Sequence, residues 1–599
     1  MPSVPSPSLS SVFPQVVFVN KAACRDCNRC VRVCPVKAIR IHDGQASIVA
    51  ERCISCGTCI RECPQSAKTF RNDLKLAASL LAEGGRVACS LAPSFAGFFS
   101  SWQRRRIPSV LRRLGFSYVG ETAIGAFYTA KATARYEERN VNREQQIVSA
   151  CPACVDYIVR YQPQWARYII PVVSPMIAHA KHIRRKLGAD TKVVFIGPCV
   201  AKKVEGYGYS DDGRIDCVLT FNEFFQWLKN EHIEVASCEE SDFDELPRGA
   251  ARYFPLEGGC VKTAGWSANL LDEKIIAVSG FDNMRHSIAE SRPGQIIEPL
   301  FCPQGCAAGP AHGSSTHGEK AEVFEARHNI MEYAREGLEA RNADPNIMET
   351  IEKDDDLSPE EEEFLRRLST RYEIPKLPKK KEVTEQQIRD VFEKTGKSLP
   401  EKQLDCGACG YPTCREMAIA VVEGLAEYEM CVPYCKQLAE QRLDRIVETS
   451  PNGIVVLDEH LNIVSMNPAF RHFFQCSNAI CGKPISYLMD PEPFERLLAD
   501  PERKVETVTD HASYHLICRE TLYALPQEKQ FVGIFMNITM LQKNETQLDQ
   551  LRERTVRQAR ELLEQQIRMA ETIASCLGEN AARAESLLEN LMEQAKQES

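Results

Sequence analysis

The sequence predicts a multidomain protein of mixed α/β and α+β type, in which small cysteine-rich modules flank a larger α/β domain. Its 599 residues exceed what one hydrophobic core usually supports. The cysteines are grouped, with eight between residues 24 and 63 and four between residues 406 and 431. Between the groups, apolar runs such as "KVVFIGPC" alternate with helical stretches such as "FNEFFQWLKNEHI". This alternation is expected for strands joined by helical crossovers.

The composition argues against several classes of protein. A net charge of −9 argues against a nucleic-acid partner, because proteins that bind nucleic acid carry a basic surplus. No segment approaches the roughly eighteen apolar residues that span a bilayer, so we expect no membrane partner. Residues 1–20 lack the features of a signal peptide and are expected to form a loose tail that leads into a strand. We therefore expect a cytoplasmic protein, where cysteines at short spacings indicate metal.

Residues 21–72 contain the run C-x2-C-x2-C-x3-C-P twice. This doubled run is typical of a two-cluster 4Fe-4S ferredoxin domain, in which the fourth cysteine of each run ligates the other cluster. A structural zinc site is the alternative interpretation. The predicted ligand sets are Cys24, Cys27, Cys30 and Cys63 for one cluster, and Cys53, Cys56, Cys59 and Cys34 for the other.

A second cysteine module occupies residues 401–435 and begins with "CGACGYPTC". Gly407 and Gly410 allow the backbone to approach a cluster closely. The module resembles the small four-cysteine iron-sulfur domain of several anaerobic redox proteins, with zinc again as the alternative. Cys435 lies outside the pattern and is interpreted as a spare thiol. The predicted ligands of a third accessory 4Fe-4S cluster are Cys406, Cys409, Cys414 and Cys431.

Three widely spaced peptides in residues 85–345 carry further cysteines: "VSACPAC", "GPCVAKKVE" and "CPQGCAAGP". In order and character they resemble the signature peptides of the iron-only (FeFe) hydrogenase catalytic domain, and similarity extends through "LGFSYVGETAIGA", "VVSPM" and "IDCVLTFNEF". The resemblance implies an H-cluster, made of a 4Fe-4S cubane and a two-iron unit, and the maturation proteins that insert it. It implies four cubane ligands, Cys151, Cys199, Cys302 and Cys306, of which Cys306 also bridges to the two-iron unit.

The resemblance also assigns roles to two charged residues. Lys202 matches the lysine that contacts a cyanide ligand of the two-iron unit, and Glu205 matches the acidic residue that closes the second peptide. A buried lysine would stabilise a negatively charged iron-cyanide group through a charge-assisted hydrogen bond. The alternative is that the four cysteines are structural core residues without a metal.

The sequence departs from the family at several positions of this site. Ala150 replaces the cysteine that donates protons to the catalytic metal, and a methyl group cannot relay a proton. Gly197 replaces a methionine, and Ala307 and Ala308 replace glycines, so the surroundings of the two-iron unit are altered. Cys154 is expected to face elsewhere rather than substitute as the relay.

The sequence of the last third of the chain predicts a sensing module. Residues 346–400 are expected to form a charged, partly helical linker, and residues 436–545 look like a PAS domain with a preceding helix. Residues 546–599 predict a polar-rich helix, either solvated and packed on its own domain or forming a dimeric coiled coil. The apolar positions of this helix are Leu548, Leu551, Leu562, Met569, Ile573 and Leu577.

Three features support the PAS resemblance: a turn at Asp458 and Asn462, a loop at Asn467, and a closing strand that runs into a helix after Thr539. The PAS fold alone does not identify a ligand. Two interpretations of the histidines in this region stay open: they include a haem ligand, or they are ordinary surface residues. The histidines are His460, His472, His511 and His515.

These observations predict a hydrogen-sensing FeFe hydrogenase of low turnover, with H2 and protons as substrates and electrons relayed to the PAS domain. The arrangement resembles the sensory, PAS-containing group of FeFe hydrogenases. Two alternatives stay open: an electron-transfer hydrogenase that exchanges electrons with ferredoxin, and a non-catalytic iron-sulfur scaffold that lacks the two-iron unit. The expected protein partners are ferredoxin or another redox protein, an unidentified downstream signalling protein, and a second copy of the chain in a homodimer.

Overall fold

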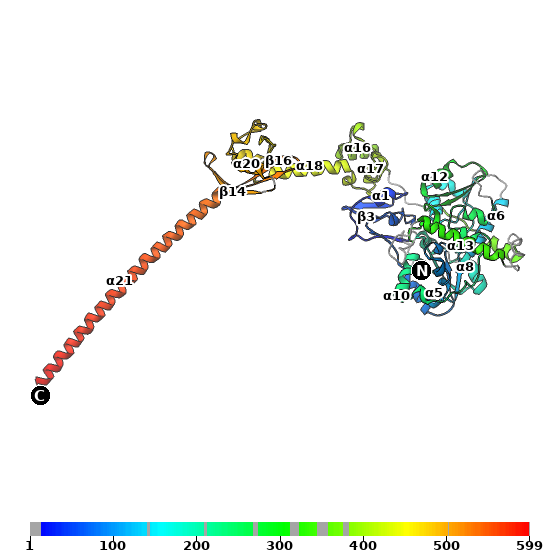
Figure 1. Cartoon of the computed structure of the whole chain (residues 1–599), viewed down its shortest axis with the longest axis horizontal. Helices are drawn as coiled ribbons and strands as arrows, with labels where there is room; N and C mark the ends of the chain where they lie inside the picture. The colour runs from blue at the N-terminus through cyan, green and yellow to red at the C-terminus, as the bar shows by residue number, and fades with distance from the viewer. Residues whose placement is uncertain are drawn as a thin grey trace, which may run out of the picture. The chain divides into compact units, whose positions relative to one another are not determined.

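The chain divides into two compact units, Met1–Cys435 and Lys436–Ser599, and each is described by itself (Figure 1). Parts of the expected tail at residues 1–20 and of the expected linker at residues 346–400 lie outside the described residues. A computed structural model describes residues 14–139, 144–208, 212–266, 273–311, 323–343, 357–374, 382–500, 502 and 504–597.

The first cysteine-rich domain is built from two short antiparallel strand pairs and two short helices. Each helix follows a residue in the left-handed conformation, Asn28 or Gly57, and carries the third cysteine of its run, Cys30 or Cys59. The left-handed residue turns the chain sharply, so a tight cysteine loop precedes each helix. The elements are β1 (Val17–Val19) paired with β4 (Lys68–Phe70), β2 (Ile39–His42) paired with β3 (Gln45–Ile48), α1 (Arg29–Val33) and α2 (Thr58–Arg61).

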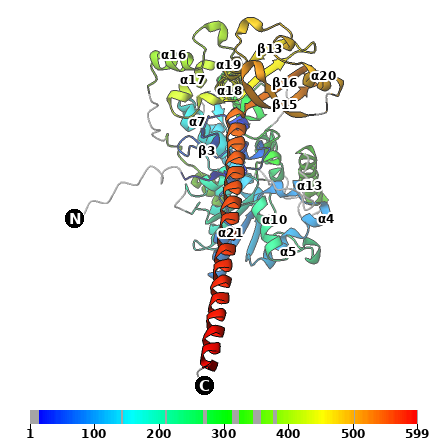
Figure 2. The ribbon, with the colours of Figure 1, turned by 90° about the vertical axis from the view of Figure 1, so that its left-hand side faces the viewer.

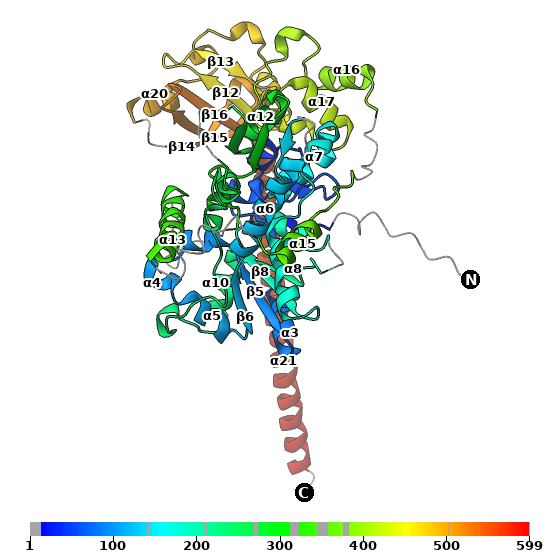
Figure 3. The same cartoon turned by 90° about the vertical axis from the view of Figure 1, so that its right-hand side faces the viewer.

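Two parallel sheets form the larger domain, and their apolar strands explain its α/β character. The four-stranded sheet has the order β6-β5-β8-β9, and the three-stranded sheet has the order β10-β11-β7. Helices α6 and α8 lie beside the larger sheet (Figure 3). The strands are β5 (Val87–Leu91), β6 (Tyr118–Glu121), β7 (Gln146–Ile147), β8 (Lys192–Gly197), β9 (Cys217–Thr220), β10 (Ile275–Ser279) and β11 (Ile296–Leu300).

The helices of this domain include α6, which packs against α8 over the sheet. They are α3 (Leu74–Ala82), α4 (Ser101–Arg104), α5 (Ile107–Arg113), α6 (Ala123–Arg139), α7 (Pro152–Tyr161), α8 (Pro175–Leu187), α9 (Ala201–Glu205), α10 (Phe221–Asn230), α11 (Gly259–Thr263), α12 (Phe281–Glu290) and α13 (Val323–Ala343).

Two helices lie within the stretch that was expected to be a charged linker. α15 (Pro359–Arg367) begins at the N-cap Ser358 and buries Phe364 and Leu365 in the core of the α/β domain. α16 (Glu385–Lys394) packs instead against α17 (Cys414–Val422) of the second cysteine module. Apolar residues spaced among the charges of these helices therefore anchor both ends of the stretch to neighbouring domains.

The second unit contains a five-stranded antiparallel sheet with the order β13-β12-β16-β15-β14. The carboxylate of Asp458 accepts hydrogen bonds from the backbone N–H groups of His460 and Asn462, which forms the expected turn. Asn467 caps the helix that follows β13. The elements are β12 (Gly453–Leu457), β13 (Ile463–Met466), α19 (Pro468–Phe473), α20 (Glu492–Ala499), β14 (Val505–His511), β15 (Leu516–Leu525) and β16 (Gln530–Asn537).

Long helices flank this sheet in the sequence. α18 (Val432–Thr449) precedes it, and α21 (Thr539–Gln597) follows it as one continuous helix (Figure 2). The expected apolar positions of α21, from Leu548 to Leu577, are all exposed. The alternative in which this helix packs on its own domain is therefore wrong for the described side chains. Among the described residues, no helix combines the length and apolar character needed to span a bilayer.

Candidate metal-cluster site

The main cavity of the first unit lies at the carboxyl ends of the strands of both parallel sheets. Ser94 follows β5, Thr122 follows β6, Ala150 follows β7, and Cys199 follows β8. Ligands of α/β proteins commonly bind at this edge, because the loops there converge from several strands. The three distant peptides bring all four predicted cubane ligands to the cavity wall: Cys151, Cys199, Cys302 and Cys306.

Local backbone geometry presents these cysteines. Cys151 is the N-cap of α7, with proline at the first helical position. Gly305 has φ +68°, and a Cβ atom there would lie 2.4 Å from the carbonyl oxygen of Pro255. Only glycine fits this turn, which allows Cys302 and Cys306 to face the same cavity.

The thiols of the metal-free site differ in protonation. Burial raises the pKa of Cys199 to about 11 and that of Cys306 to about 12, and it raises the pKa of Cys302 well above its ordinary value. A hydrogen bond from Cys154 is the main cause that lowers the pKa of Cys151 to about 6. Because metal ligands are thiolates, loading this site with iron releases protons from the buried thiols.

Cys154 does not line the cavity, yet its thiol points back towards the site. It is buried, and its one S–H proton has two alternative acceptors, the carbonyl oxygen of Pro299 at 3.5 Å and the sulfur of Cys151. It is placed to orient a cluster ligand, whereas a relay would need an atom that faces the cavity.

Lys202 is the one cation among the described residues that line the cavity. Its Nζ donates to Glu205 Oε2 at 2.8 Å and to Ser174 Oγ at 2.9 Å. These two acceptors hold the ammonium group at the cavity wall and partly offset its desolvation. The role of Ser174 was missed in the sequence, although its peptide "VVSPM" was among the similar segments.

Three positions where the sequence departs from the family, Gly197, Ala307 and Ala308, lie near the cavity in sequence but are not among its lining residues. At Gly197, a Cβ atom would lie 2.7 Å from the ring of Phe195, and that ring itself lines the cavity. Ala307 and Ala308 are buried. The Oγ of Ser94 is buried at the wall and has no hydrogen-bond partner among the described residues. The cavity is thus mostly apolar, with one unpartnered polar atom among its described lining residues.

The two predicted ferredoxin sets each come together around a cavity of their own. The first cavity is lined by Cys24, Cys27, Cys30 and Cys63, and the second by Cys34, Cys53, Cys56 and Cys59. Each set therefore contains the fourth cysteine of the other run.

The second ferredoxin cavity adjoins the main cavity. Cys56 lines both of them. Gly57 approaches Pro310 so closely that a Cβ atom would lie 2.4 Å from the proline ring. Arg160 of α7 donates to the carbonyl oxygen of Cys53 at 2.9 Å. These contacts place the two sites side by side without an intervening layer of protein.

The second cysteine module contacts the ferredoxin domain, as Figure 1 shows for α16 and α17 beside α1 and β3. Lys37 Nζ donates to the carbonyl oxygen of Gly410 at 2.7 Å. Within the module, buried Lys397 donates to Cys414 Sγ at 3.1 Å and also hydrogen-bonds to Cys431. The ammonium group of Lys397 therefore joins two of the predicted ligands of this module.

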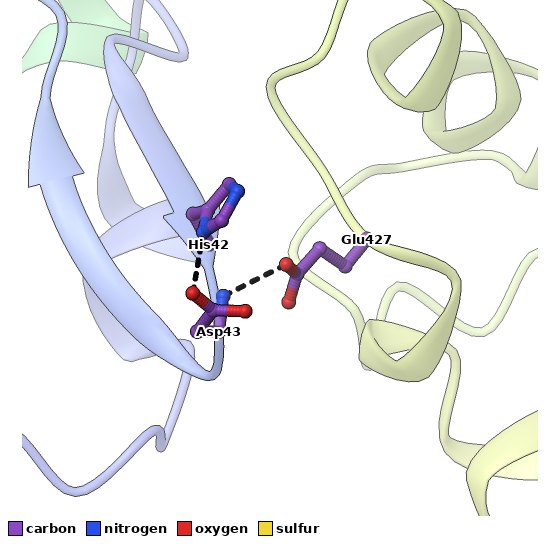
Figure 4. A group of neighbouring side chains, drawn as sticks. All are labelled: His42, Asp43 and Glu427. Atoms are coloured by element: carbon purple, nitrogen blue, oxygen red, sulfur yellow. Dashed lines mark hydrogen bonds and ion pairs between the residues drawn. The ribbon is translucent and has the colours of Figure 1, made fainter.

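A group of polar side chains at this contact resembles a metal site only in its composition. Figure 4 shows His42 and Asp43 at the tip of the β2–β3 hairpin facing Glu427 of the second module. Glu427 Oε1 accepts the backbone N–H of Asp43 at 2.8 Å, and His42 is exposed. The carboxylate of Glu427 therefore serves as a hydrogen-bond acceptor that joins the two domains.

The histidines of the second unit favour the surface interpretation over a haem ligand. His460, His472 and His515 are exposed. His511 is partly buried, and its Nε2 lies 2.7 Å from Glu520 Oε1. Each of the four is thus either solvated or already partnered.

The family comparisons agree with this domain order. Residues 85–310 match the iron-only hydrogenase large subunit, C-terminal domain, and residues 16–64 match the 4Fe-4S dicluster domain. Residues 399–433 match an Fe-S cluster family, and residues 441–509 match the PAS domain. The predicted multidomain fold is confirmed: a ferredoxin-like 4Fe-4S domain, an FeFe-hydrogenase catalytic domain, a small Fe-S domain and a PAS domain.

Known relatives are similar over part of the chain. The NADP-reducing hydrogenase subunit HndD of Solidesulfovibrio fructosivorans is 23% identical over 395 residues, which is 55% of this chain and 63% of that protein. The cytosolic Fe-S cluster assembly factor NAR1 of Encephalitozoon cuniculi is 26% identical over 217 residues, which is 32% of this chain and 57% of that protein. The chain thus spans about three fifths of these curated relatives.

Among solved structures, the apo [FeFe]-hydrogenase HydA1 of Chlamydomonas reinhardtii matches with 19% identity and a TM-score of 0.37, over 43% of this chain and 88% of that one. Fold and cysteine sets together define a hydrogenase-like iron-sulfur protein. In this chain, the hydrogenase-like part is joined to a PAS domain.

Proposed function

We propose that this protein is a hydrogen-sensing FeFe hydrogenase of low turnover that works in the cytoplasm. The observation that carries the proposal is one cavity in which four cysteines meet a buried lysine, while Ala150 occupies the position of the family's proton donor. Such a site has the ligands for hydrogen chemistry but lacks the usual proton relay.

The residues of the cavity fit an H-cluster. Four thiolates suit a 4Fe-4S cubane, with Cys306 as the bridge to the two-iron unit. Lys202 would hold a cyanide ligand by a charge-assisted hydrogen bond, and Glu205 and Ser174 keep its ammonium group in place. When bound, the group supplies the reversible conversion of H2 into two protons and two electrons. The protein's part is to exclude water, orient the group and carry protons and electrons.

The proposed electron route follows the shared walls between the sites. Electrons leave the main cavity through Cys56, which also lines the second ferredoxin cavity. Lys37 of the ferredoxin domain then bridges to the second module: its Nζ lies 5.7 Å from the centroid of the Tyr411 ring and donates to the carbonyl oxygen of Gly410, next to the predicted ligand Cys409. Cys431 directly precedes α18, which leads into the PAS domain. A change of charge at this last cluster would thereby act on the helix that enters the sensing domain.

Specific observations favour the two alternatives. Glycine at position 197, next to the cavity-lining ring of Phe195, and the similarity to an Fe-S cluster assembly factor favour a non-catalytic scaffold. Similarity to an NADP-reducing hydrogenase subunit favours an enzyme that exchanges electrons with ferredoxin or another redox protein. In each case the maturation proteins, or their absence, decide whether the two-iron unit is present.

Exposure to hydrogen is expected to reduce the accessory clusters of matured protein that contains no other reductant. Electron paramagnetic resonance should then show the second-module cluster among the reduced species, because its site lies beside the ferredoxin domain. A Cys414→Ser variant should lose that signal and keep the ferredoxin signals, whereas Cys481→Ser, an exposed PAS thiol, should behave as the native protein. Clusters that stay oxidised under hydrogen would contradict the proposed function.

Fully loaded protein is expected to contain three accessory 4Fe-4S clusters and the H-cluster, which is about eighteen irons per chain. The reason is that sixteen cysteines form four complete sets. Iron and zinc analysis of reconstituted protein checks this number. Iron for only one or two clusters, together with stoichiometric zinc, would contradict it.

We further propose that α21 forms a parallel coiled coil with a second copy of the chain. Apolar side chains alternate at spacings of four and three over its second half, and all are exposed. This spacing is the heptad pattern of a two-stranded coiled coil. The positions are Leu563, Ile567, Ala570, Ala574, Leu577, Ala581, Ala584, Leu588 and Leu591.

The full chain is therefore expected to sediment as a dimer. A double variant that places charges at two of these apolar positions, Leu577→Asp with Leu588→Asp, should be monomeric. Like charges buried between two helices oppose their pairing. The matched control Leu399→Asp changes an exposed leucine outside α21 and should stay dimeric. Analytical ultracentrifugation distinguishes these states, and a monomeric native chain would refute the proposal.

A further inference from the structure

A line of hydroxyl groups and one imidazole starts at the wall of the main cavity. Thr122 lines the cavity, and its Oγ1 lies 2.7 Å from Ser90 Oγ. Ser90 Oγ lies 2.8 Å from Nδ1 of His179. All three residues are almost completely buried. The line therefore carries hydrogen bonds from the cavity into the interior of the domain.

The fold makes room for this imidazole beneath the sheet. Ser90 lies on β5, Thr122 directly follows β6, and His179 projects from α8. At Gly125, a Cβ atom would lie 2.7 Å from the Cβ of His179, and at Gly120 it would lie 3.1 Å from His179 Cε1. The two glycines thus allow α8 to approach closely enough for the ring to reach Ser90.

The contact with Ser90 uses only one of the two ring nitrogens of His179. Its Nε2 is buried and has no hydrogen-bond partner among the described residues. Burial, followed by the nearby His182, lowers the pKa of the His179 ring to about 3, so the ring is neutral at physiological pH. A neutral imidazole has one donor and one acceptor nitrogen. A buried imidazole with an unused nitrogen indicates a partner such as an ordered water.

Beyond the unpartnered Nε2 of His179, polar side chains continue towards the surface of the domain. The ring of His182 is stacked with that of His179 at a centroid distance of 6.3 Å. His182 Nε2 lies 3.0 Å from Glu245 Oε1, and the Glu245 side chain is 26% exposed. Lys186 and the Tyr118 hydroxyl also contact this carboxylate, and Arg185 lies 3.4 Å from the Nδ1 of His182, so both nitrogens of His182 are engaged. The Tyr118 hydroxyl lies beside the His179 ring, because a Cβ atom at Gly120 would lie 2.9 Å from this hydroxyl and 3.1 Å from His179 Cε1. Solvent protons can therefore reach Glu245 and the Tyr118 hydroxyl.

We propose that Thr122, Ser90 and His179, joined by a water to Tyr118 and Glu245, form a proton path that serves the main cavity in place of the missing cysteine at Ala150. The inference rests on the proposed hydrogen chemistry, which needs protons at this cavity. A proton taken up at Glu245 passes to the Tyr118 hydroxyl, which releases its own proton to the water, and the water passes one to His179 Nε2. The ring releases its Nδ1 proton to Ser90, which passes its own hydroxyl proton to Thr122, and Thr122 releases one into the cavity.

Each group in this sequence gains one proton and loses one, so no net charge remains on the path. The reverse order serves hydrogen oxidation. A neutral histidine suits this step, because it accepts at one nitrogen while it donates at the other. The hydroxyl groups reset by rotating about their C–O bonds, and the His179 ring resets by turning over about its Cβ–Cγ bond.

The first test needs no metal cluster. Histidine ring signals of the metal-free full chain, labelled with nitrogen-15, are assigned by substitution among the twelve histidines. The His179 ring is expected to stay neutral across the neutral pH range, and its N–H proton should exchange with D2O much faster than the backbone amides of β5. Exchange as slow as that of β5 would overturn the proposal, because no water would then reach the ring.

The second test compares variants matured with the two-iron unit, at equal occupancy by infrared intensity. His179→Gln and Thr122→Val should each lower hydrogen output by about tenfold to a hundredfold and raise the solvent deuterium isotope effect, since a positioned relay contributes that much or more. The matched control Thr133→Val removes a buried hydroxyl that bonds only within α6, to the carbonyl oxygen of Thr129 at 2.8 Å, and should be unchanged.

Native turnover and isotope effect in both His179→Gln and Thr122→Val would overturn the path. If matured native protein produces no hydrogen at all, the proposed function fails, and the exchange measurement on metal-free protein still decides whether the proton path exists. The threonine variant is nearly isosteric, so it decides the question even if the histidine variant does not fold.

Discussion

A Cys306→Ser variant is expected to lose hydrogen turnover completely while it keeps its accessory clusters. Cys306 is the one cavity cysteine assigned to join the cubane and the two-iron unit, and a serine oxygen is a poor ligand for iron in such a cluster. The two ferredoxin cavities use other cysteines and do not include residue 306. Hydrogen output and electron paramagnetic resonance of the same sample check both parts.

The control for this variant is Cys435→Ser. Cys435 is exposed and lies outside every predicted ligand set, so its loss should change neither turnover nor the cluster signals. Native hydrogen output in Cys306→Ser would contradict the assignment of the bridging ligand. Loss of the ferredoxin signals in that variant would show that the sites are not independent.

An Ala150→Cys variant is expected to evolve hydrogen faster than the native protein, by roughly tenfold. Ala150 lines the main cavity, so a thiol there can pass a proton to a group bound in it. Positioned relays contribute about a hundred- to ten-thousand-fold in rate, but the gain here should be smaller. The added sulfur must fit a packed wall, and the path through His179 already supplies protons.

Ala150→Val is the matched control, because valine adds volume at the same position without a group that carries a proton. It should be no faster than the native protein. Hydrogen output is compared at equal H-cluster occupancy by infrared intensity. If the native protein already turns over as fast as typical FeFe hydrogenases, or if Ala150→Cys is no faster, proton transfer at residue 150 does not limit the rate. The sensor interpretation would then lose its main chemical support.

Much of the site could be predicted because cluster ligands are local in sequence. The spacing of Cys24 to Cys34 and of Cys53 to Cys63 already indicates which cysteines share a cavity, and the structure groups them in the same sets. The three peptides of the α/β domain follow strands, so their order along the chain predicts a meeting point at the carboxyl ends of the sheets.

Other parts depend on contacts that no local pattern reveals. Ser90, Thr122 and His179 are far apart in sequence and meet only because Gly120 and Gly125 let α8 approach the sheet. The expected linker was predicted to be partly helical, but its many charges masked the few apolar residues that pack its two described helices against neighbouring domains. The apolar pattern of α21 predicted a helix but not the surface against which the helix packs. Its apolar side chains are exposed in the structure, so they do not pack on its own domain.

Infrared spectroscopy of protein matured with the two-iron unit tests the central claim most directly. Carbonyl and cyanide stretches arise only if the cavity of Cys151, Cys199, Cys302 and Cys306 holds that unit. The account predicts that these bands appear, that they are lost in Cys306→Ser, and that the cyanide bands shift when Lys202 is replaced by methionine. Protein that carries its full set of accessory clusters but shows no such bands after maturation would contradict the account and identify an iron-sulfur scaffold.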